Sequence, residues 1–211
     1  MTMKRMRLVV VAAALAGVAA GVAMQAQMAG GSGGGQMGGQ AAAPPSGPVD
    51  PAKSFDASVS QIERLWTGAA QAMPADKYDF APSAVIFVPG QKVQYDGVRT
   101  FAQIVTHTIQ ANYNYFSMIG GIKPDVDLKA IADLKSKDDI VKALAATFVF
   151  AHKAVANVTA ANAFDGIRGT QTRASMMAAA VGHAEDEYGQ AVEYLRMNAI
   201  VPPASEGRPR M

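Results

Sequence analysis

The sequence predicts an all-α protein, a four-helix bundle with a long crossover between its second and third helices. Two observations predict this fold class. Apolar residues recur at three- and four-residue spacing in four segments, which places them on one face of a helix. The stretch 122–137 between the second and third segments is long enough to carry the chain back along the bundle. These two helices therefore need not be antiparallel neighbours.

The first predicted helix begins at Asp50-Pro51 and ends before Pro74. Asp50 can cap the helix, and proline is tolerated at the first helical position because its missing N–H would have no intrahelical partner. The residues of its apolar stripe are Phe55, Val59, Ile62, Trp66, Ala69 and Met73. Because Trp66 belongs to this stripe, we expect its side chain to be buried in the bundle.

Residues 82–97, which follow the first helix, have a different pattern. Two runs rich in β-forming residues, 84–88 and 93–95, flank a Pro-Gly turn at 89–90. This arrangement predicts either a small β-hairpin or an ordered loop between the first two helices.

A capping box opens the second predicted helix, because Thr100 is followed three residues later by Gln103. This helix ends before the glycines at 120–121. In the connection that follows, we expect one or two helical turns around residues 128–134. Ser136 then caps the third helix.

The fourth predicted helix follows a break at Asp165-Gly166 and begins at Thr170 or Thr172. We expect it to end at Pro202-Pro203, since proline cannot continue a helix. The residues of its apolar stripe are Met177, Val181, Ala184, Tyr188, Ala191 and Leu195.

Residues 1–26 are predicted to be a signal peptide. Basic residues within positions 4–7 precede an uncharged apolar run, 8–24, and cleavage is expected after Ala23 or Ala26. The alternative is a retained membrane anchor, because a run of about 17 residues is at the lower limit for a span. We favour cleavage, since the run is rich in Ala and Gly rather than Leu. The protein is then exported to the periplasm or the extracellular space.

Residues 27–49 are predicted to be a disordered linker, because they are rich in Gly, Ala and Pro and contain no charged residue before Asp50. Residues 50–205 remain as one domain of common size. Loss of three basic residues with the signal would change the formal net charge from +2 to −1.

The basic residues form no cluster, which argues against nucleic acid as a partner. After signal cleavage we also expect no membrane association. The chain contains no cysteine, which excludes disulfides, thiolate metal sites and a cysteine nucleophile.

The candidate functional residues include the three histidines, which all lie within predicted helices. His183 is followed four residues later by Glu187, and this spacing places both side chains on one helix face, where they can bind one divalent cation. The other half of such a site must come from another helix, and His107 is the best candidate. His152 lies at the edge of the third helix's stripe. It is either a fourth ligand or a core histidine, and we favour the core position.

Other polar and aromatic residues lie close to these candidates in the sequence. Glu185 and Asp186 are expected to face solvent. Asn112, Tyr113 and Tyr115 follow His107 and either line a pocket or flank the end of the bundle.

The order and spacing of three segments resemble the DinB-like superfamily of four-helix bundles. These segments are residues 73–82 after the first helix, 100–107 at the start of the second, and 183–203 at the close of the fourth. The resemblance covers most of residues 50–205. It implies a bundle with a parallel middle pair of helices, in agreement with the long connection, and frequent homodimers.

The superfamily that this chain resembles typically carries a divalent metal on three histidines, one from the second helix and an H-x-x-x-H pair from the fourth. Matched to this sequence, the pattern implies His107 and His183 as ligands, whereas Glu187 stands where the third histidine is expected. Two histidines and a glutamate form a ligand set of catalytic zinc, and a carboxylate also suits harder ions. The bound ion could be zinc, nickel, manganese or iron. Alternatively, this chain is a member of the superfamily that has lost its metal.

Two hypotheses of different classes follow from this resemblance. The first is a metal-dependent transferase or hydrolase of unknown substrate, since some relatives are enzymes in which the metal activates a thiol. The second is a non-catalytic exported bundle, which binds a small-molecule ligand or has a structural role. Cytosolic thiols should be scarce outside the cell, which argues against a thiol transferase.

Overall fold

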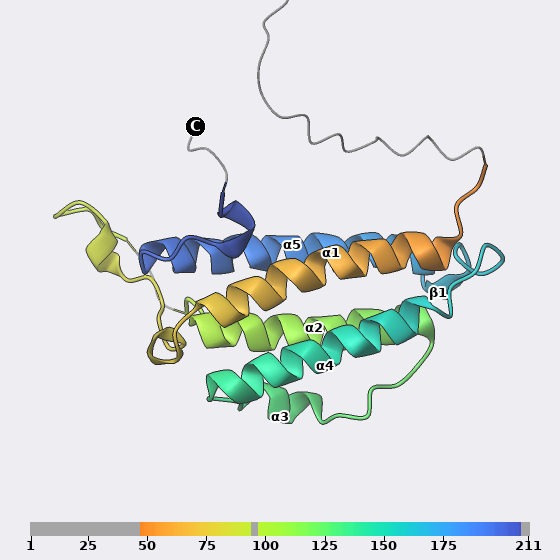
Figure 1. Ribbon diagram of the computed structural model, residues 1–211, viewed down its shortest axis with the longest axis horizontal. Helices are drawn as coiled ribbons and strands as arrows, with labels where there is room; N and C mark the ends of the chain where they lie inside the picture. The colour runs from red at the N-terminus through yellow and green to blue at the C-terminus, as the bar shows by residue number, and fades with distance from the viewer. Residues whose placement is uncertain (1–46, 94–96, 208–211) are drawn as a thin grey trace, which may run out of the picture. The chain divides into compact units, whose positions relative to one another are not determined.

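The computed structural model describes residues 47–93 and 97–207, which form a four-helix bundle (Figure 1). Its long helices are α1 (Pro51–Ala72), α2 (Phe101–Gly120), α4 (Lys137–Val155) and α5 (Arg173–Met197). The shorter elements are helix α3 (Leu128–Ala132), strands β1 (Gly166–Arg168) and β2 (Gln171–Thr172), and 3-10 turns at Ala75–Lys77, Ala84–Ile86 and Pro203–Ser205. The predicted all-α fold class is confirmed.

The capping residues act as the sequence predicts. The Asp50 side chain accepts a hydrogen bond from the backbone N–H of Ala52, and Ser136 accepts one from Asp139. Thr100 and Gln103 form the expected capping box at the start of α2. Each of these bonds satisfies a backbone N–H that has no partner within its own helix.

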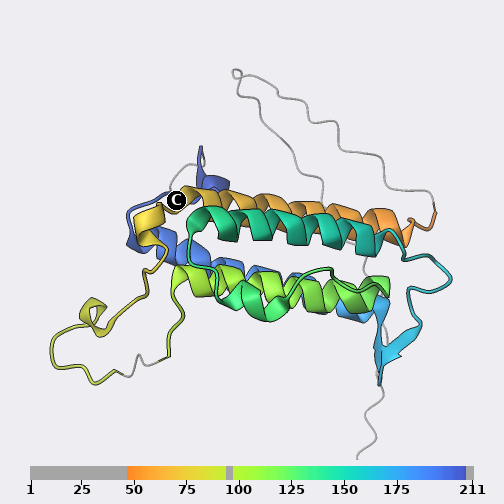
Figure 2. The ribbon, with the colours of Figure 1, turned by 90° about the horizontal axis from the view of Figure 1, so that it is seen from below.

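Helices α2 and α4 run in one direction, and α1 and α5 run in the other (Figures 1 and 2). The ends of α2 and α4 lie together, because a Cβ added at Gly120 would come within 2.6 Å of the Cα of Ala154. Only glycine permits this close approach. At the same end, the guanidinium of Arg173 at the start of α5 donates to the carbonyl of Ile119 in α2. Helix α2 is therefore parallel to α4 and antiparallel to α5.

The long connection between α2 and α4 makes this parallel pair possible. Its helix α3 packs against α2, where the Gln110 side-chain amide donates to the carbonyl of Leu128 at 2.6 Å. The chain is thereby held on the surface of α2 while it returns to the other end of the bundle. The crossover that the sequence predicts is confirmed, including its short helix.

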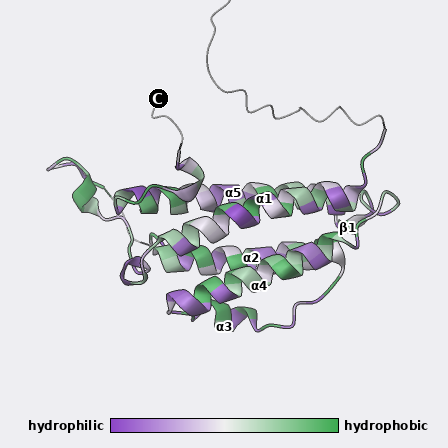
Figure 3. Cartoon of the chain, in the orientation of Figure 1, coloured by the Kyte–Doolittle hydropathy of each residue, from purple (hydrophilic) through white to green (hydrophobic). Residues whose placement is uncertain are grey.

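The core is built from the apolar stripes of the four long helices, whose outer faces carry hydrophilic residues (Figure 3). Trp66 is completely buried, as expected. Its indole Nε1–H donates to the carbonyl of Ala184 in α5 at 2.9 Å. Its ring also makes an edge contact with Tyr188, with ring centroids 6.0 Å apart. Trp66 therefore joins α1 to the face of α5 that adjoins the candidate site.

The hairpin considered between the first two helices is not formed by the described residues 82–93. Ala84–Ile86 form a single 3-10 turn, and Val85 is 85% exposed. An apolar strand needs a neighbouring strand and a core to cover one face, and this loop has neither among the described residues. Residues 94–96, in the second half of the expected hairpin, lie outside the described residues.

The end of the fourth helix was predicted wrongly, because α5 ends at Met197 and not at the prolines. Ala199 adopts a positive φ of 60°, and Ile200 N–H donates to the Leu195 carbonyl at 2.9 Å. This is a Schellman motif, which satisfies the last carbonyls of the helix and normally has glycine at its left-handed position. Because alanine and not glycine occupies that position, the sequence carries no glycine signal for the helix end.

The fourth helix begins at one of the two predicted positions, and a hairpin that the sequence did not predict precedes it. Thr172, and not Thr170, caps α5 in a capping box with Ser175. The antiparallel strands β1 and β2 precede it, and Gly169 in their turn has a φ of 57°. The sequence indicated only a break at this point.

The predicted signal peptide, 1–26, and almost all of the predicted linker, 27–49, lie outside the described residues. Both assignments stay predictions. Within residues 47–93 and 97–207, no helix has the length and apolar character needed to cross a bilayer.

We predict that Trp66→Ala lowers the free energy of unfolding by about 3–5 kcal/mol, because it removes a fully buried aromatic ring. Trp66→Phe should cost less, since it keeps most of the buried surface and loses the bond to Ala184. Urea unfolding measures both. Lys53→Ala, at an exposed position of the same helix, is the control and should change stability by less than about 0.5 kcal/mol. A Trp66→Ala variant as stable as this control would contradict the packing.

Candidate metal centre

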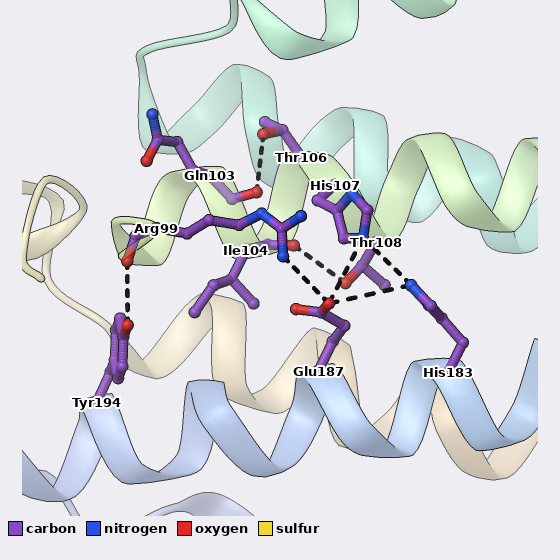
Figure 4. A network of polar contacts seen from close by, with 9 residues as sticks. All are labelled: Arg99, Gln103, Ile104, Thr106, His107, Thr108, His183, Glu187 and Tyr194. Atoms are coloured by element: carbon purple, nitrogen blue, oxygen red, sulfur yellow. Dashed lines mark hydrogen bonds and ion pairs between the residues drawn. The ribbon is translucent and has the colours of Figure 1, made fainter. Parts of the chain in front are cut away.

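The three candidate ligands come from two antiparallel helices that pack side by side. His107 lies in the first half of α2, and His183 and Glu187 lie one turn apart in α5 (Figure 4). Residues four apart share a helix face, so both α5 side chains point toward α2. The antiparallel packing of α2 and α5 brings His107 to their level. The structure therefore brings together all three residues that the sequence singled out.

The distances among the three side chains suit one bound ion. His107 Nε2 lies 3.2 Å from His183 Nε2 and 3.5 Å from Glu187 Oε1, and His183 Nε2 lies 3.9 Å from the same oxygen. Ligand atoms on a tetrahedral ion with bonds of about 2.1 Å are separated by about 3.4 Å. Nitrogen and carboxylate oxygen at these separations are close enough to hold a metal ion.

Burial adds a second indication of a missing partner. The Glu187 side chain is only 6% exposed. Its Oε2 is buried and, like the buried Nδ1 of His183, has no hydrogen-bond partner among the described residues. A buried polar atom without a partner is destabilising, and a buried carboxylate needs a compensating positive charge. The ligand set thus has the charge and the unsatisfied atom that a cation site requires.

The protonation of His107 is compatible with metal binding. Burial lowers the pKa of His107 below its usual value, and the nearby Arg99 guanidinium acts in the same direction. The Glu187 carboxylate opposes this shift but does not cancel it. A neutral imidazole has a free lone pair, which is the form that binds a metal.

Arg99 is the part of the site that sequence reasoning missed. Its Nη1 lies 3.4 Å from Glu187 Oε1, the oxygen that both histidines also approach (Figure 4). The Tyr194 hydroxyl donates to the Arg99 carbonyl at 3.0 Å and ties this residue to α5. Arg99 directly precedes the cap of α2, and no periodic pattern links it to a residue 88 positions away. The site therefore contains one fixed positive charge of its own.

His152 is neither a fourth ligand nor a core histidine, so both expectations for it are corrected. It lies on α4 against α1, where Nδ1 is 2.5 Å from Asp56 Oδ1 and Nε2 is 3.1 Å from Glu63 Oε2. Ionised carboxylates only accept hydrogen bonds, so both ring nitrogens donate and the ring is an imidazolium. Its side chain is 31% exposed. At the edge of the stripe it reaches the carboxylates of a neighbouring helix instead of the core.

The polar and aromatic residues that neighbour the candidate ligands in the sequence lie in three different environments. Glu185 and Asp186 are exposed, as expected. Asn112 and Tyr113 are buried in the core. Tyr115 instead lines a pocket of about 510 Å³ that includes His107 and His183 among its walls. Its ring centroid is 5.7 Å from that of His183, so an aromatic wall adjoins the candidate metal centre.

The fold and site together define a four-helix bundle with a parallel middle pair and a His-His-Glu group between two of its helices. Comparison with known families agrees with this description, because the sequence profile of the DinB superfamily matches residues 58–191. The chain belongs to the DinB superfamily. No curated protein is significantly similar to it in sequence.

We predict that the contribution of His152 to stability depends on pH. Burial alone would lower the pKa of His152, but its hydrogen bonds to Asp56 and Glu63 outweigh burial and raise the pKa. Stabilisation by a group with a raised folded pKa is complete below its unfolded value of about 6.5 and is lost as pH rises through the folded value. The difference in unfolding free energy between wild type and His152→Gln should therefore be larger at about pH 5.5 than at about pH 9.5.

Urea unfolding at the two pH values measures this difference. Lys153→Gln, at the exposed neighbouring position, is the control and should show a small difference at both. A His152→Gln effect that is the same at both pH values would contradict the imidazolium assignment.

Proposed function

We propose that this protein is a metal-binding member of the DinB superfamily that holds one divalent cation on His107, His183 and Glu187. The observation that carries the proposal is the convergence of His107 Nε2, His183 Nε2 and Glu187 Oε1, each within 3.9 Å of the others. The buried Oε2 of Glu187 has no hydrogen-bond partner among the described residues and supports the proposal, because a cation would compensate its charge.

The ligand set also limits the chemistry of the site. Two neutral imidazoles and one carboxylate would hold zinc, nickel, manganese or iron and leave a coordination position for water or a substrate. A bound ion would supply Lewis acidity, as metal-dependent transferases and hydrolases require. In this chain the imidazoles supply lone pairs, Glu187 supplies the negative charge, and Arg99 reduces that charge. We therefore infer a metal-dependent transferase or hydrolase.

A second candidate function is a bundle that has lost its metal. The contact between Arg99 Nη1 and Glu187 Oε1 at 3.4 Å favours it, because a guanidinium can neutralise the buried carboxylate in place of an ion. The protein would then be a non-catalytic ligand-binding or structural bundle. The two candidates differ in whether Arg99 competes with a metal or replaces one.

We also propose that the protein is exported and functions in the periplasm or outside the cell. The basic and apolar start of the chain and the glycine-rich stretch after it support this proposal. A homodimer is proposed on the resemblance to the superfamily alone.

We predict that the wild-type protein, freed of metal by a chelator and dialysed, binds about one equivalent of zinc. His183→Ala and Glu187→Ala should weaken binding by about 100-fold or more, since even residues behind the ligands contribute 10–100-fold. Glu187→His should keep zinc and nickel binding, because imidazole suits both ions and the four-residue spacing is preserved. Isothermal titration calorimetry measures all four proteins.

The matched control for these variants is Glu185→Ala, which removes an exposed carboxylate from the same helix and should leave the affinity unchanged. Wild-type protein that binds no zinc, or a Glu187→Ala variant that binds it as tightly as wild type, would refute the proposed ligand set.

A separate prediction concerns Arg99. If its guanidinium competes with the ion for Glu187 Oε1, Arg99→Gln should tighten zinc binding by up to about fivefold, the effect of a part-exposed ion pair. If Arg99 instead replaces a lost metal, Arg99→Gln should leave zinc unbound and lower stability, because the buried charge of Glu187 then has no compensating cation. Zinc titration and urea unfolding, with Arg64→Gln as an exposed control, separate the two outcomes.

A further inference from the structure

We propose that the pocket beside the metal centre binds a small organic anion, whose negative group lies near Lys129 and Arg168 and whose apolar body lies on Tyr115 and Met118. The proposal deepens the proposed function, because it rests on the metal centre for the position of the ligand's reacting end. The pocket has walls beyond the candidate metal ligands, and the proposal says which class of ligand these walls would bind.

The pocket extends along the outside of α2 from the metal centre toward β1. Its volume of about 510 Å³ lies within the range of small-molecule sites. His107 and His183 belong to its wall. Arg168, also in the wall, lies just before α5, whereas His183 is ten residues inside that helix, or about 15 Å along its axis. Arg168 therefore lies toward the end of the pocket that is farther from the metal centre.

Helix α3 forms the second side of the pocket and contributes the other cation. The bond from Gln110 to the Leu128 carbonyl holds α3 against α2, and Lys129 follows directly. Gln110, one turn after His107 in α2, lies in the same wall. Lys129 is thereby held along the side of the pocket, and the long crossover between α2 and α4 acquires a role in binding as well as in topology.

The charge of the pocket favours an anion. Lys129 and Arg168 line it, and no Asp or Glu does so among the described residues. Neither cationic side chain forms an ion pair or hydrogen bond within residues 47–93 and 97–207. By contrast, Arg196 pairs with Glu193, and the Lys137 ammonium donates to two carbonyls. A divalent ion held by a single carboxylate would add net positive charge at the opposite end.

The apolar part of the wall indicates that the anion is organic. Tyr115, Met118, Leu128 and Ala111 offer aromatic and aliphatic surface. The Tyr115 ring lies against His183, so an apolar or aromatic body would pack beside the metal centre. Inorganic phosphate would leave this surface uncovered. The ligand class that matches both parts is a small carboxylate or phosphate ester with an apolar body.

The test uses the zinc-loaded full chain with 3-phenylpropionate as the probe, followed by isothermal titration calorimetry. We expect saturable binding that weakens by about fivefold in Lys129→Gln and in Arg168→Gln, the effect of one part-exposed charge contact. The neutral analogue 3-phenylpropanamide and inorganic phosphate should each bind more weakly than the probe. Lys142→Gln, an exposed lysine outside the pocket, is the matched control and should bind the probe like wild type.

Zinc affinity is measured in the same variants, and both should bind zinc like wild type. A zinc-loaded wild type that does not bind the probe would overturn the anion site and leave the metal centre intact. Equal binding of the probe and its neutral amide, or full binding by the Lys129→Gln/Arg168→Gln double variant, would also overturn it. If wild type binds the probe but no zinc, the anion site stands and the proposed metal centre fails.

Discussion

The buried carboxylate of Glu187 is the constraint on which the arrangement of the site depends. A negative charge in the interior of a bundle must be compensated, or it destabilises the fold. Arg99 and two imidazoles approach one of its oxygens, while the other has no partner among the described residues. Because burial keeps the pKa of His107 low, that imidazole contributes a lone pair and not a positive charge. Arg99, which is nearly half exposed, compensates the carboxylate only in part. A bound cation would complete the compensation.

The topology of the bundle supplies the geometry that this carboxylate needs. The long crossover makes α2 parallel to α4 and leaves α2 antiparallel to α5, so His107 lies at the level of His183 and Glu187. Gly120 permits the close approach of α2 and α4 at one end, and Arg173 ties α5 to α2 nearby. The same crossover carries α3, which forms a wall of the adjoining pocket. The connection that determines the helix order thus also shapes the space beside the proposed metal centre.

Local signals in the sequence were sufficient for the helices and for half of the site. The Thr100–Gln103 capping box and the burial of Trp66 follow from short-range spacing, as does the shared face of His183 and Glu187. Features that depend on packing between helices could not be predicted. The contact of Arg99 with Glu187 and the pairing of His152 with two α1 carboxylates join residues far apart in the chain. The end of α5 was missed for a local reason, because alanine occupies a turn position that usually holds glycine.

The most direct test of the central claim is anomalous diffraction at the zinc absorption edge from crystals of the zinc-loaded protein. We predict one strong peak between α2 and α5, about 2.0–2.2 Å from the Nε2 atoms of His107 and His183 and from a carboxylate oxygen of Glu187. The guanidinium of Arg99 should then have moved away from the oxygen that it contacts without the ion. Absence of this peak, with Arg99 still in contact with Glu187, would contradict the claim that these three residues form a metal centre.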